Sequence, residues 1–229
     1  MLSAILVAAG SSQRMGFDKL FAIIAGEPVI AHAMRAFDRA TSVNEIIVVS
    51  REERHREIRE ITRGAGLKKV RSIVRGGERR QDSVRAGFNR MDRAATHVAI
   101  HDAARPLITP EQIERTLEQC RVHGAAALAQ PVNDTLKRAD DNLVVSGSVD
   151  RHQLYAMQTP QIFERKLIED AYRAVYTEDL SVTDEVSAVE HLGHNIALVV
   201  NDDFNFKITY PRDLLVAEFI LRERAKDIR

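Results

Sequence analysis

The chain has 229 residues, of which 45% are hydrophobic and 29% charged, an ordinary composition for a globular protein. This length suffices to bury the core of one good-sized α/β domain, with or without a small appendage. Lysine and arginine together number 33, as do aspartate and glutamate, so the formal net charge is zero. Nucleic acids and anionic membranes both reward a basic excess, so neither is expected as the main partner.

Cysteine use and hydrophobic patterning indicate a cytoplasmic protein. The single cysteine, Cys120, excludes an internal disulfide and any multi-cysteine metal site, and its helical surroundings favour a packed thiol over a catalytic one. No apolar run approaches the length that spans a bilayer. The opening stretch MLSAILVAAG lacks the basic segment of a signal peptide, and we interpret it as a first buried strand.

Short apolar runs alternate with longer amphipathic stretches along the first half of the chain. We expect strands at 3–9, 45–50, 70–74 and 97–101, and helices at 27–40, 52–66, 80–91 and 109–124. The last of these helices is the best marked, because Thr109 caps its start, Gln112 completes a capping box and Gly124 lies beyond its end. Pro28 suits the first turn of the first helix. Strict alternation predicts right-handed crossovers and a mostly parallel α/β sheet covered by helices on both faces.

The pattern changes at about residue 134. After a strand at 125–132, residues 134–158 show strand-like stretches around the turn ADDN and no helical period, which predicts a protruding β-hairpin arm. An isolated two-stranded hairpin is marginal in water, so the arm is expected to pack on something, most simply a second copy of the chain. Helices at 165–178 and 183–193, a strand at 196–200 and a helix at 211–227 complete one domain, residues 1–229, with one inserted arm.

Three unusual segments follow the first, third and fourth strands, and ligands of open α/β sheets bind beyond the carboxyl ends of strands. The first segment, GSSQRMGFDK, combines small residues that let backbone N–H groups approach an anion with the charges of Arg14 and Lys19. The chain has no G-K-S/T, and no G-x-G-x-x-G follows the first strand, so neither common nucleotide loop is present. The segment therefore indicates phosphate binding of another kind, with a generic strand-to-helix turn as the alternative.

The second segment, RGGERRQDS, brings Gly76 and Gly77 together with Arg79, Arg80 and, at a helix start, Ser83. Two adjacent glycines make this turn flexible, and Arg79 and Arg80 add positive charge. Helix capping by the polar residues at its end is the structural alternative.

The third segment, HDAARP, ends a buried strand with Asp102 and continues to Arg105. The aspartate could hold a metal or a hydroxyl, and the arginine could bind a phosphate with two hydrogen bonds. An ion pair between the two is the structural alternative. His191 and His194 are too few for a zinc site, and no activated nucleophile is visible, which indicates direct group transfer without a covalent intermediate.

Several stretches together resemble one enzyme family. They are AAGSSQRMG, GGERRQDSVRAGF, HDAARP, PVNDTLKRA, VDR, QTPQIF, TDEVSAVE and NFKITYPRDLLVAEFIL, and they run in family order over nearly the whole chain. The chain resembles the 2-C-methyl-D-erythritol 4-phosphate cytidylyltransferases of the non-mevalonate isoprenoid pathway. The resemblance implies a Rossmann-like sheet with an arm that clasps its counterpart in a homodimer. It also implies transfer of CMP from CTP to a sugar-alcohol phosphate, with Mg²⁺ and with release of pyrophosphate.

The resemblance also implies roles for single residues. The triphosphate would be bound by residues of the first segment, namely Ala8, Ala9, Gly10, Arg14 and Lys19, and the cytosine and ribose by Gly77 and Ser83. The methylerythritol phosphate would face Asp102, Arg105, Thr183 and Lys207, together with the arm residues Thr135 and Arg151 of a neighbouring subunit. The catalytic cations would be Arg14, Lys19 and Lys207. Mg²⁺ would bind mainly through the CTP phosphates, with Asp102 as a further candidate ligand.

The chain departs from the family at several positions, most of them in the first segment. RMGFDKL is shorter than the usual stretch between the arginine and the lysine, and Asp18 stands where the family has proline. Leu20 replaces a common glutamine, and Glu78 stands where some relatives carry aspartate. Two alternative functions stay open: cytidylyl transfer to ribitol 5-phosphate or another polyol phosphate, and a non-catalytic nucleotide sensor. Guanylyl transfer to a molybdenum cofactor leaves the arm unexplained.

Overall fold

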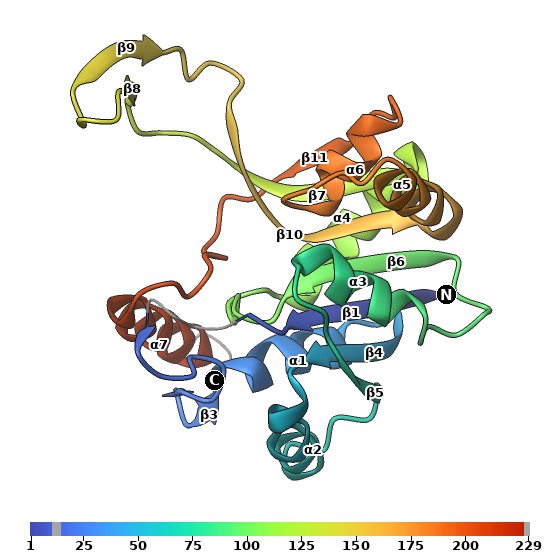
Figure 1. Ribbon diagram of the computed structural model, residues 1–229. Coiled ribbons are helices and arrows are strands. Elements are labelled where there is room, and N and C mark those ends of the chain that lie inside the picture. The colour runs from blue at the N-terminus through green and yellow to red at the C-terminus, as the bar shows by residue number, and fades with distance from the viewer. Residues whose placement is uncertain (11–14, 227–229) are drawn as a thin grey trace.

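The computed structural model describes residues 1–10 and 15–226, in which seven strands form a central sheet (Figure 1). In spatial order these strands are β11 (Ala197–Val200), β7 (Ala125–Pro131), β10 (Tyr155–Glu164), β6 (His97–Asp102), β1 (Leu2–Ala8), β4 (Val43–Ser50) and β5 (Val70–Arg75). The strands β5, β4, β1 and β6 run parallel, as β11 does to β7. The expected mostly parallel sheet is therefore confirmed.

Strand β10 is the exception, and it was not predicted. It runs antiparallel to both of its neighbours, β6 and β7. Its pairing with β7 shifts between Met157 and Gln161, around Pro160, which has no N–H group to donate to a strand ladder. The proline disfavours a strand prediction at this position, and the predicted arm, residues 134–158, includes the first residues of β10, from Tyr155.

Helices cover both faces of the sheet. One face carries α1 (Val29–Arg39), α2 (His55–Gly64), α4 (Pro110–His123) and part of α7 (Pro211–Lys226), and the other carries α3 (Arg80–Phe88), α5 (Arg165–Thr177) and α6 (Glu185–His191). Strand β1 shows why two layers form, because the successive side chains of Ile5 and Leu6 are both fully buried, in opposite cores. Within the described residues, no helix combines the length and apolar character needed to cross a membrane.

Helix boundaries largely follow their sequence signals. At the start of α4, Thr109 accepts from the backbone N–H of Gln112 at 3.3 Å, and the side chain of Gln112 accepts from the N–H of Thr109 at 3.0 Å. Gly124 ends this helix with a left-handed φ of 78°. The expectation for Pro28 was wrong, because it precedes α1 as the last residue of an unpredicted two-strand turn, β2 (Ile23–Ile24) and β3 (Glu27–Pro28).

The segment expected to form an arm contains an antiparallel hairpin. Its strands are β8 (Leu136–Ala139) and β9 (Val145–Val149), and the hairpin stands well away from the central sheet (Figure 1). Leu143, at its tip, is 86% exposed, and the neighbouring Val144 and Val145 are exposed as well. The arm thus presents apolar side chains to solvent in the single chain.

Candidate active site

The carboxyl ends of the parallel strands β1, β5 and β6 lie along one edge of the sheet, where they border a cavity of about 260 Å³. Its described lining comprises Val7, Ala8, Ala9, Gly10, Lys19, Leu20, Gly77, Glu78, Arg79, Arg80, Ser83, Asp102, Ala104 and Lys207. Eight of the predicted site residues that the structure describes are among these: Ala8, Ala9, Gly10, Lys19, Gly77, Ser83, Asp102 and Lys207. The fold therefore gathers the three unusual segments around one hollow.

The double glycine lets two of these segments approach each other closely. A Cβ atom on Gly76 would lie 2.7 Å from both the Cβ of Ala9 and the Oγ of Ser83, closer than side-chain atoms pack. A Cβ on Gly77 would lie 2.4 Å from the Cβ of Asp82. The backbone N–H of Gly77 also donates to Ser83 Oγ at 3.2 Å, so the start of α3 is tied to the glycine turn. The glycines are thus required by close packing against Ala9, which follows β1, and against the start of α3.

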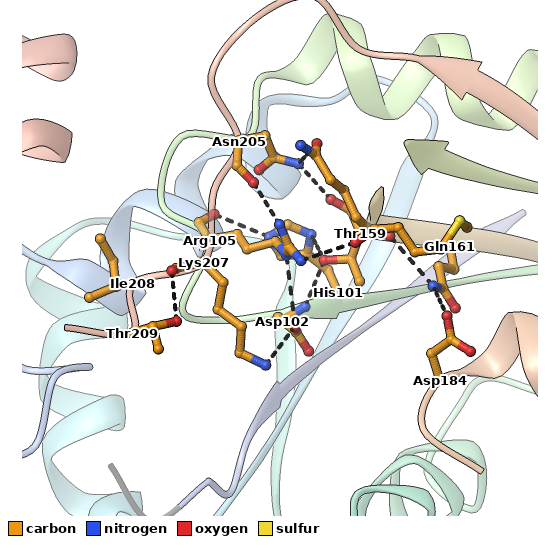
Figure 2. Close-up of polar contacts among 12 residues, drawn as sticks. His101, Asp102, Arg105, Thr159, Gln161, Asp184, Asn205, Lys207, Ile208 and Thr209 are labelled. Carbon is orange, nitrogen blue, oxygen red and sulfur yellow. Dashed lines mark hydrogen bonds and ion pairs between the residues drawn. The ribbon is translucent and has the colours of Figure 1, made fainter. Parts of the chain in front are cut away.

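Asp102, the last residue of β6, is the anionic centre of the site (Figure 2). Lys207 Nζ lies 2.9 Å from its Oδ2, Arg80 Nη2 lies 3.4 Å from its Oδ1, and Arg105 Nε lies 3.7 Å from its Oδ2. Burial alone would raise the pKa of Asp102, but Arg80, Lys207 and Arg105 together hold it well below its usual value. The carboxylate is therefore ionised throughout the physiological range.

Arg80 and Glu185 are functional candidates that sequence reasoning did not include among the site residues. Arg80 lines the cavity and forms an ion pair with the fully buried carboxylate of Glu185, which also accepts a hydrogen bond from Tyr172 Oη at 2.9 Å. Burial alone would lower the pKa of Arg80, but Glu185 and Asp102 raise it. No specific signal in the sequence marks Arg80, because nothing in RGGERR distinguishes it from the neighbouring arginines. Glu185 lies in the family stretch TDEVSAVE, where only the fold shows its partner.

Arg105 does not line the cavity. Its guanidinium donates to the carbonyl oxygens of Asn205 at 2.8 Å and Met157 at 3.5 Å. Its Nε lies 3.7 Å from Oδ2 of Asp102. Burial lowers its pKa, although Asp102 acts in the opposite direction. The predicted contact of Arg105 with substrate is thus not supported by its position, and the ion pair with Asp102, the structural alternative, is present.

A buried histidine orients the end of β6. Thr159 Oγ1 accepts from the backbone N–H of Asp102 at 3.1 Å and lies 2.9 Å from His101 Nδ1, while His101 Nε2 lies 3.2 Å from the carbonyl oxygen of Arg105 (Figure 2). Burial lowers the pKa of His101 to about 4, so the ring is neutral at pH 7. A carbonyl can only accept, so Nε2 carries the proton and Thr159 donates to Nδ1. His101 is therefore part of the scaffold.

Lys19 reaches the segment that carries Lys207. Its Nζ donates to the carbonyl oxygen of Ile208 at 2.6 Å, and the N–H of Ile208 donates to the carbonyl oxygen of Ala104 at 2.8 Å. The first turn, the loop after β6 and the segment before α7 are thus joined at one point. The shortened turn still directs its lysine into the cavity.

Three other predicted residues that the structure describes, Thr135, Arg151 and Thr183, are not brought to the cavity wall. Thr135 and Arg151 lie on the arm, where Arg151 donates to the carbonyl oxygen of Asn133. Thr183 is exposed and immediately precedes Asp184, which caps α6 by accepting from the N–H of Ser187 at 3.0 Å. Arg14 lies outside the described residues.

Metal-binding groups are sparse in the part of the chain that the structure describes. No group of three or more histidine, cysteine, aspartate and glutamate side chains there could hold an ion. Two carboxylates, Glu78 and Asp102, line the cavity. Mg²⁺ commonly binds through one or two carboxylates together with substrate phosphates, and this donor set fits that mode. Cys120 is fully buried, and burial raises the pKa of its thiol to about 12, which confirms a packed cysteine.

Known proteins share this fold and sequence over nearly their whole length. A sequence model of the family 2-C-methyl-D-erythritol 4-phosphate cytidylyltransferase (IspD) matches residues 2–223. The cytidylyltransferase of that name from Caldanaerobacter subterraneus subsp. tengcongensis is 42% identical over 225 residues, which are 97% of this chain and 99% of that protein. The crystal structure of 4-diphosphocytidyl-2C-methyl-D-erythritol synthase from Anaerococcus prevotii superimposes with a TM-score of 0.84 at 28% identity, covering 97% of this chain and 98% of that one. For 2-C-methyl-D-erythritol 4-phosphate cytidylyltransferase from Thermus thermophilus the TM-score is 0.77 at 29% identity, with 95% and 98% covered.

Proposed function

The chain belongs to the 2-C-methyl-D-erythritol 4-phosphate cytidylyltransferase family, and we propose that it transfers CMP from CTP to 2-C-methyl-D-erythritol 4-phosphate. The products are CDP-methylerythritol and pyrophosphate, and the enzyme is a nucleotidyltransferase of non-mevalonate isoprenoid biosynthesis. The observation that carries the proposal is the convergence of Lys19 and Lys207, from opposite ends of the chain, beside one cavity at the carboxyl edge of the sheet. Two fixed cations beside a turn of small residues suit a polyphosphate.

The transfer is a direct displacement at phosphorus. An oxygen of the acceptor phosphate attacks the α-phosphorus of CTP in line, the bond between this phosphorus and the α,β-bridging oxygen breaks, and pyrophosphate leaves on the opposite side. The attacking phosphate is already anionic at neutral pH, so no general base is needed. The obstacle is the approach of two polyanions, which positioning and fixed positive charge overcome. We assign this role to Lys19 and Lys207, together with Arg14.

The other predicted site residues take binding roles in this proposal. Ala9 and Gly10 offer backbone N–H groups to the triphosphate, while Gly77 and Ser83 border the space for the cytosine and ribose. Asp102 faces the acceptor, and it keeps Lys207 within reach of the acceptor's phosphate.

Mg²⁺ is the cofactor we propose. When bound, it would neutralise part of the charge on the triphosphate. Asp102 is the candidate protein ligand, with Glu78 as the second carboxylate of the cavity. Most of the coordination would come from the CTP phosphates and water.

We further propose a homodimer in which the arm of one subunit completes the site of the other. Thr135 and Arg151 flank a hairpin that stands away from the central sheet, which makes contact with a second copy the simplest role for them (Figure 1). The exposed apolar residues at the tip, among them Leu143, would be covered in such an assembly. For location we propose the cytoplasm, where a fully buried single cysteine is ordinary.

The function is tested by measuring pyrophosphate release from CTP and Mg²⁺ with methylerythritol 4-phosphate and with ribitol 5-phosphate, offered separately. We expect rapid release with methylerythritol 4-phosphate alone. Release with ribitol 5-phosphate alone would instead identify a polyol-phosphate cytidylyltransferase. Binding of CTP without release in either assay would identify a nucleotide sensor. The similarity to the cytidylyltransferases over nearly the whole chain does not favour either alternative.

A further inference from the structure

The segment that follows β4 supplies two arginines to the turn after β1. Arg54 is the last residue of η2 (Glu52–Arg54) and only 5% exposed. Its guanidinium donates to the carbonyl oxygen of Ala8 from Nη1 at 2.5 Å and to that of Gly10 from Nη2 at 3.0 Å. Arg51 donates from Nε to the carbonyl oxygen of Ala9 at 3.2 Å. One short segment thus binds three successive carbonyl groups at the start of the turn.

The same guanidinium also reaches the far end of the turn. Arg54 Nε lies 2.5 Å from Oδ2 of Asp18, the residue immediately before Lys19. The other carboxylate oxygen of Asp18 accepts from the backbone N–H of Leu20 at 3.2 Å, and its carbonyl oxygen accepts from the N–H of Phe21 at 3.2 Å. Asp18 therefore begins the tight backbone turn that presents Lys19, and Arg54 fixes this backbone turn to the end of β1.

The direction of the carbonyl groups determines where the neighbouring donors point. A planar trans peptide directs its C=O and N–H groups to opposite sides. The carbonyl oxygens of Ala8 and Ala9 are turned towards the two arginines, so the N–H groups of Ala9 and Gly10 are turned away from them. Ala9 and Gly10 both line the cavity, where successive N–H groups can bind an anion. The arginines thus orient backbone donors for a phosphate without needing to contact it.

We propose that Arg54, assisted by Arg51, is a positioning residue for the nucleotide, with Asp18 as its counterion. It ties both ends of the phosphate-binding turn together, so that the backbone donors of Ala9 and Gly10 and the ammonium of Lys19 meet the triphosphate at the same time. The proposal rests on the proposed function of the cavity and extends it to the segment after β4, which none of the family stretches includes.

We call the contacts of Arg54 with Ala8, Gly10 and Asp18 the clamp, and two variants test it without removing a residue of the cavity wall. Arg54→Lys keeps the charge, but a single ammonium cannot span two carbonyl oxygens and a carboxylate as the planar guanidinium does. Asp18→Asn keeps the shape of a side chain that is 32% exposed, and it removes the charge that Arg54 meets. Arg75→Ala is the matched control, because Arg75 pairs with Glu52 of the same segment at 3.6 Å and both side chains are more than 70% exposed.

The expected result is selective for the nucleotide. Misplacement of the turn by about 1 Å should lower kcat/KM for CTP by about 100-fold in Arg54→Lys, and by less in Asp18→Asn. The KM for methylerythritol 4-phosphate should stay at its wild-type value, and Arg75→Ala should match the wild type in all constants. A residue that serves stability alone would not separate the two Michaelis constants. Equal changes in the Michaelis constants for CTP and for methylerythritol 4-phosphate would overturn the proposal. Wild-type kinetic constants in both variants would overturn it as well.

Calorimetry of CTP binding with Mg²⁺ and without acceptor separates this proposal from the proposed function. Weaker binding by Asp18→Asn than by the wild type supports the clamp, whatever acceptor the enzyme uses, and unchanged binding rejects it. A wild type that releases no pyrophosphate with methylerythritol 4-phosphate would contradict only the proposed function. Should Arg54→Lys fail to fold, Asp18→Asn decides the question, because its partly exposed side chain makes it the milder change.

Discussion

The ammonium of Lys207 lies 2.9 Å from Oδ2 of Asp102, although the two residues come from distant parts of the chain (Figure 2). The side chain of Asp102 is 11% exposed, whereas that of Lys207 is 42% exposed. The lysine therefore forms the open side of the ion pair, where an incoming phosphate meets it. The other two cations of the carboxylate are Arg80, which also lines the cavity, and Arg105, which does not.

From this geometry we expect Lys207→Met to lower kcat by about 100- to 1000-fold, the usual effect of removing one preorganised electrostatic group. Folding should be little affected, because Asp102 retains Arg80 and Arg105. The measurement is steady-state pyrophosphate release, with circular dichroism to confirm the fold. Lys226→Met, which removes an exposed lysine of α7, is the control. Wild-type turnover of Lys207→Met would exclude the lysine from the transfer step.

Glu185 is expected to matter for the stability of the fold. Removing a buried partner of an ion pair leaves the other charge uncompensated, so Glu185→Ala should lower the free energy of unfolding by about 3 kcal/mol. Tyr172→Phe removes only one hydrogen bond to that carboxylate and should cost about 1 kcal/mol. Denaturant unfolding measures both. Glu178→Gln, at an exposed pair with His191, should leave stability unchanged, and an equally stable Glu185→Ala would show that Arg80 needs no such partner.

The buried neutral ring of His101 predicts a loss of stability in mild acid. The pKa of an unfolded histidine is about 6.5, and burial lowers that of His101 to about 4. Between these values the unfolded chain binds a proton that the native protein does not, so stability falls as the pH decreases. The slope approaches about 1.4 kcal/mol per pH unit below pH 6, and the loss from pH 7 to pH 5 is about 2 kcal/mol.

Denaturant unfolding between pH 5 and pH 7 checks this effect of His101. His97 acts in the same direction, because burial also lowers its pKa. The difference in slope between the wild type and His101→Asn therefore isolates His101. An identical slope in both proteins would contradict the prediction.

Mixed dimers test whether the arm acts on the neighbouring site. Arg151→Ala alters the arm and Lys207→Met alters the cavity, and each variant alone should be nearly inactive. If the arm acts on the partner, subunit exchange in an equal mixture should restore about a quarter of wild-type activity, because half of the dimers then contain one intact composite site. No recovery after verified subunit exchange would show that each arm serves its own subunit, and wild-type activity of Arg151→Ala alone would show that Arg151 has no role in the site.

The sequence determined most of the local structure of the chain and located the three segments that border its candidate site. The spacing of apolar residues and the helix-capping residues predicted the helices, because these signals act over a few residues. In α4, Thr109, Gln112 and Gly124 have their expected roles. The three segments beyond β1, β5 and β6 were located in the same way, because parallel strands place their carboxyl ends along one edge. Here the sequence pattern was sufficient, since both the elements and the edge they share follow from local rules.

Only the tertiary structure decided which charges meet. Nothing local distinguishes Arg80, which joins Asp102 to the buried Glu185, from Arg79, which pairs with Asp82 on the surface. Likewise only the fold shows that Arg105, expected at the substrate, pairs with Asp102 and lies outside the cavity lining. Strand β10 was missed because Pro160 hides its pattern. The physical reason for the charged residues is that a charge takes its role from partners that packing brings close, and packing depends on the whole chain.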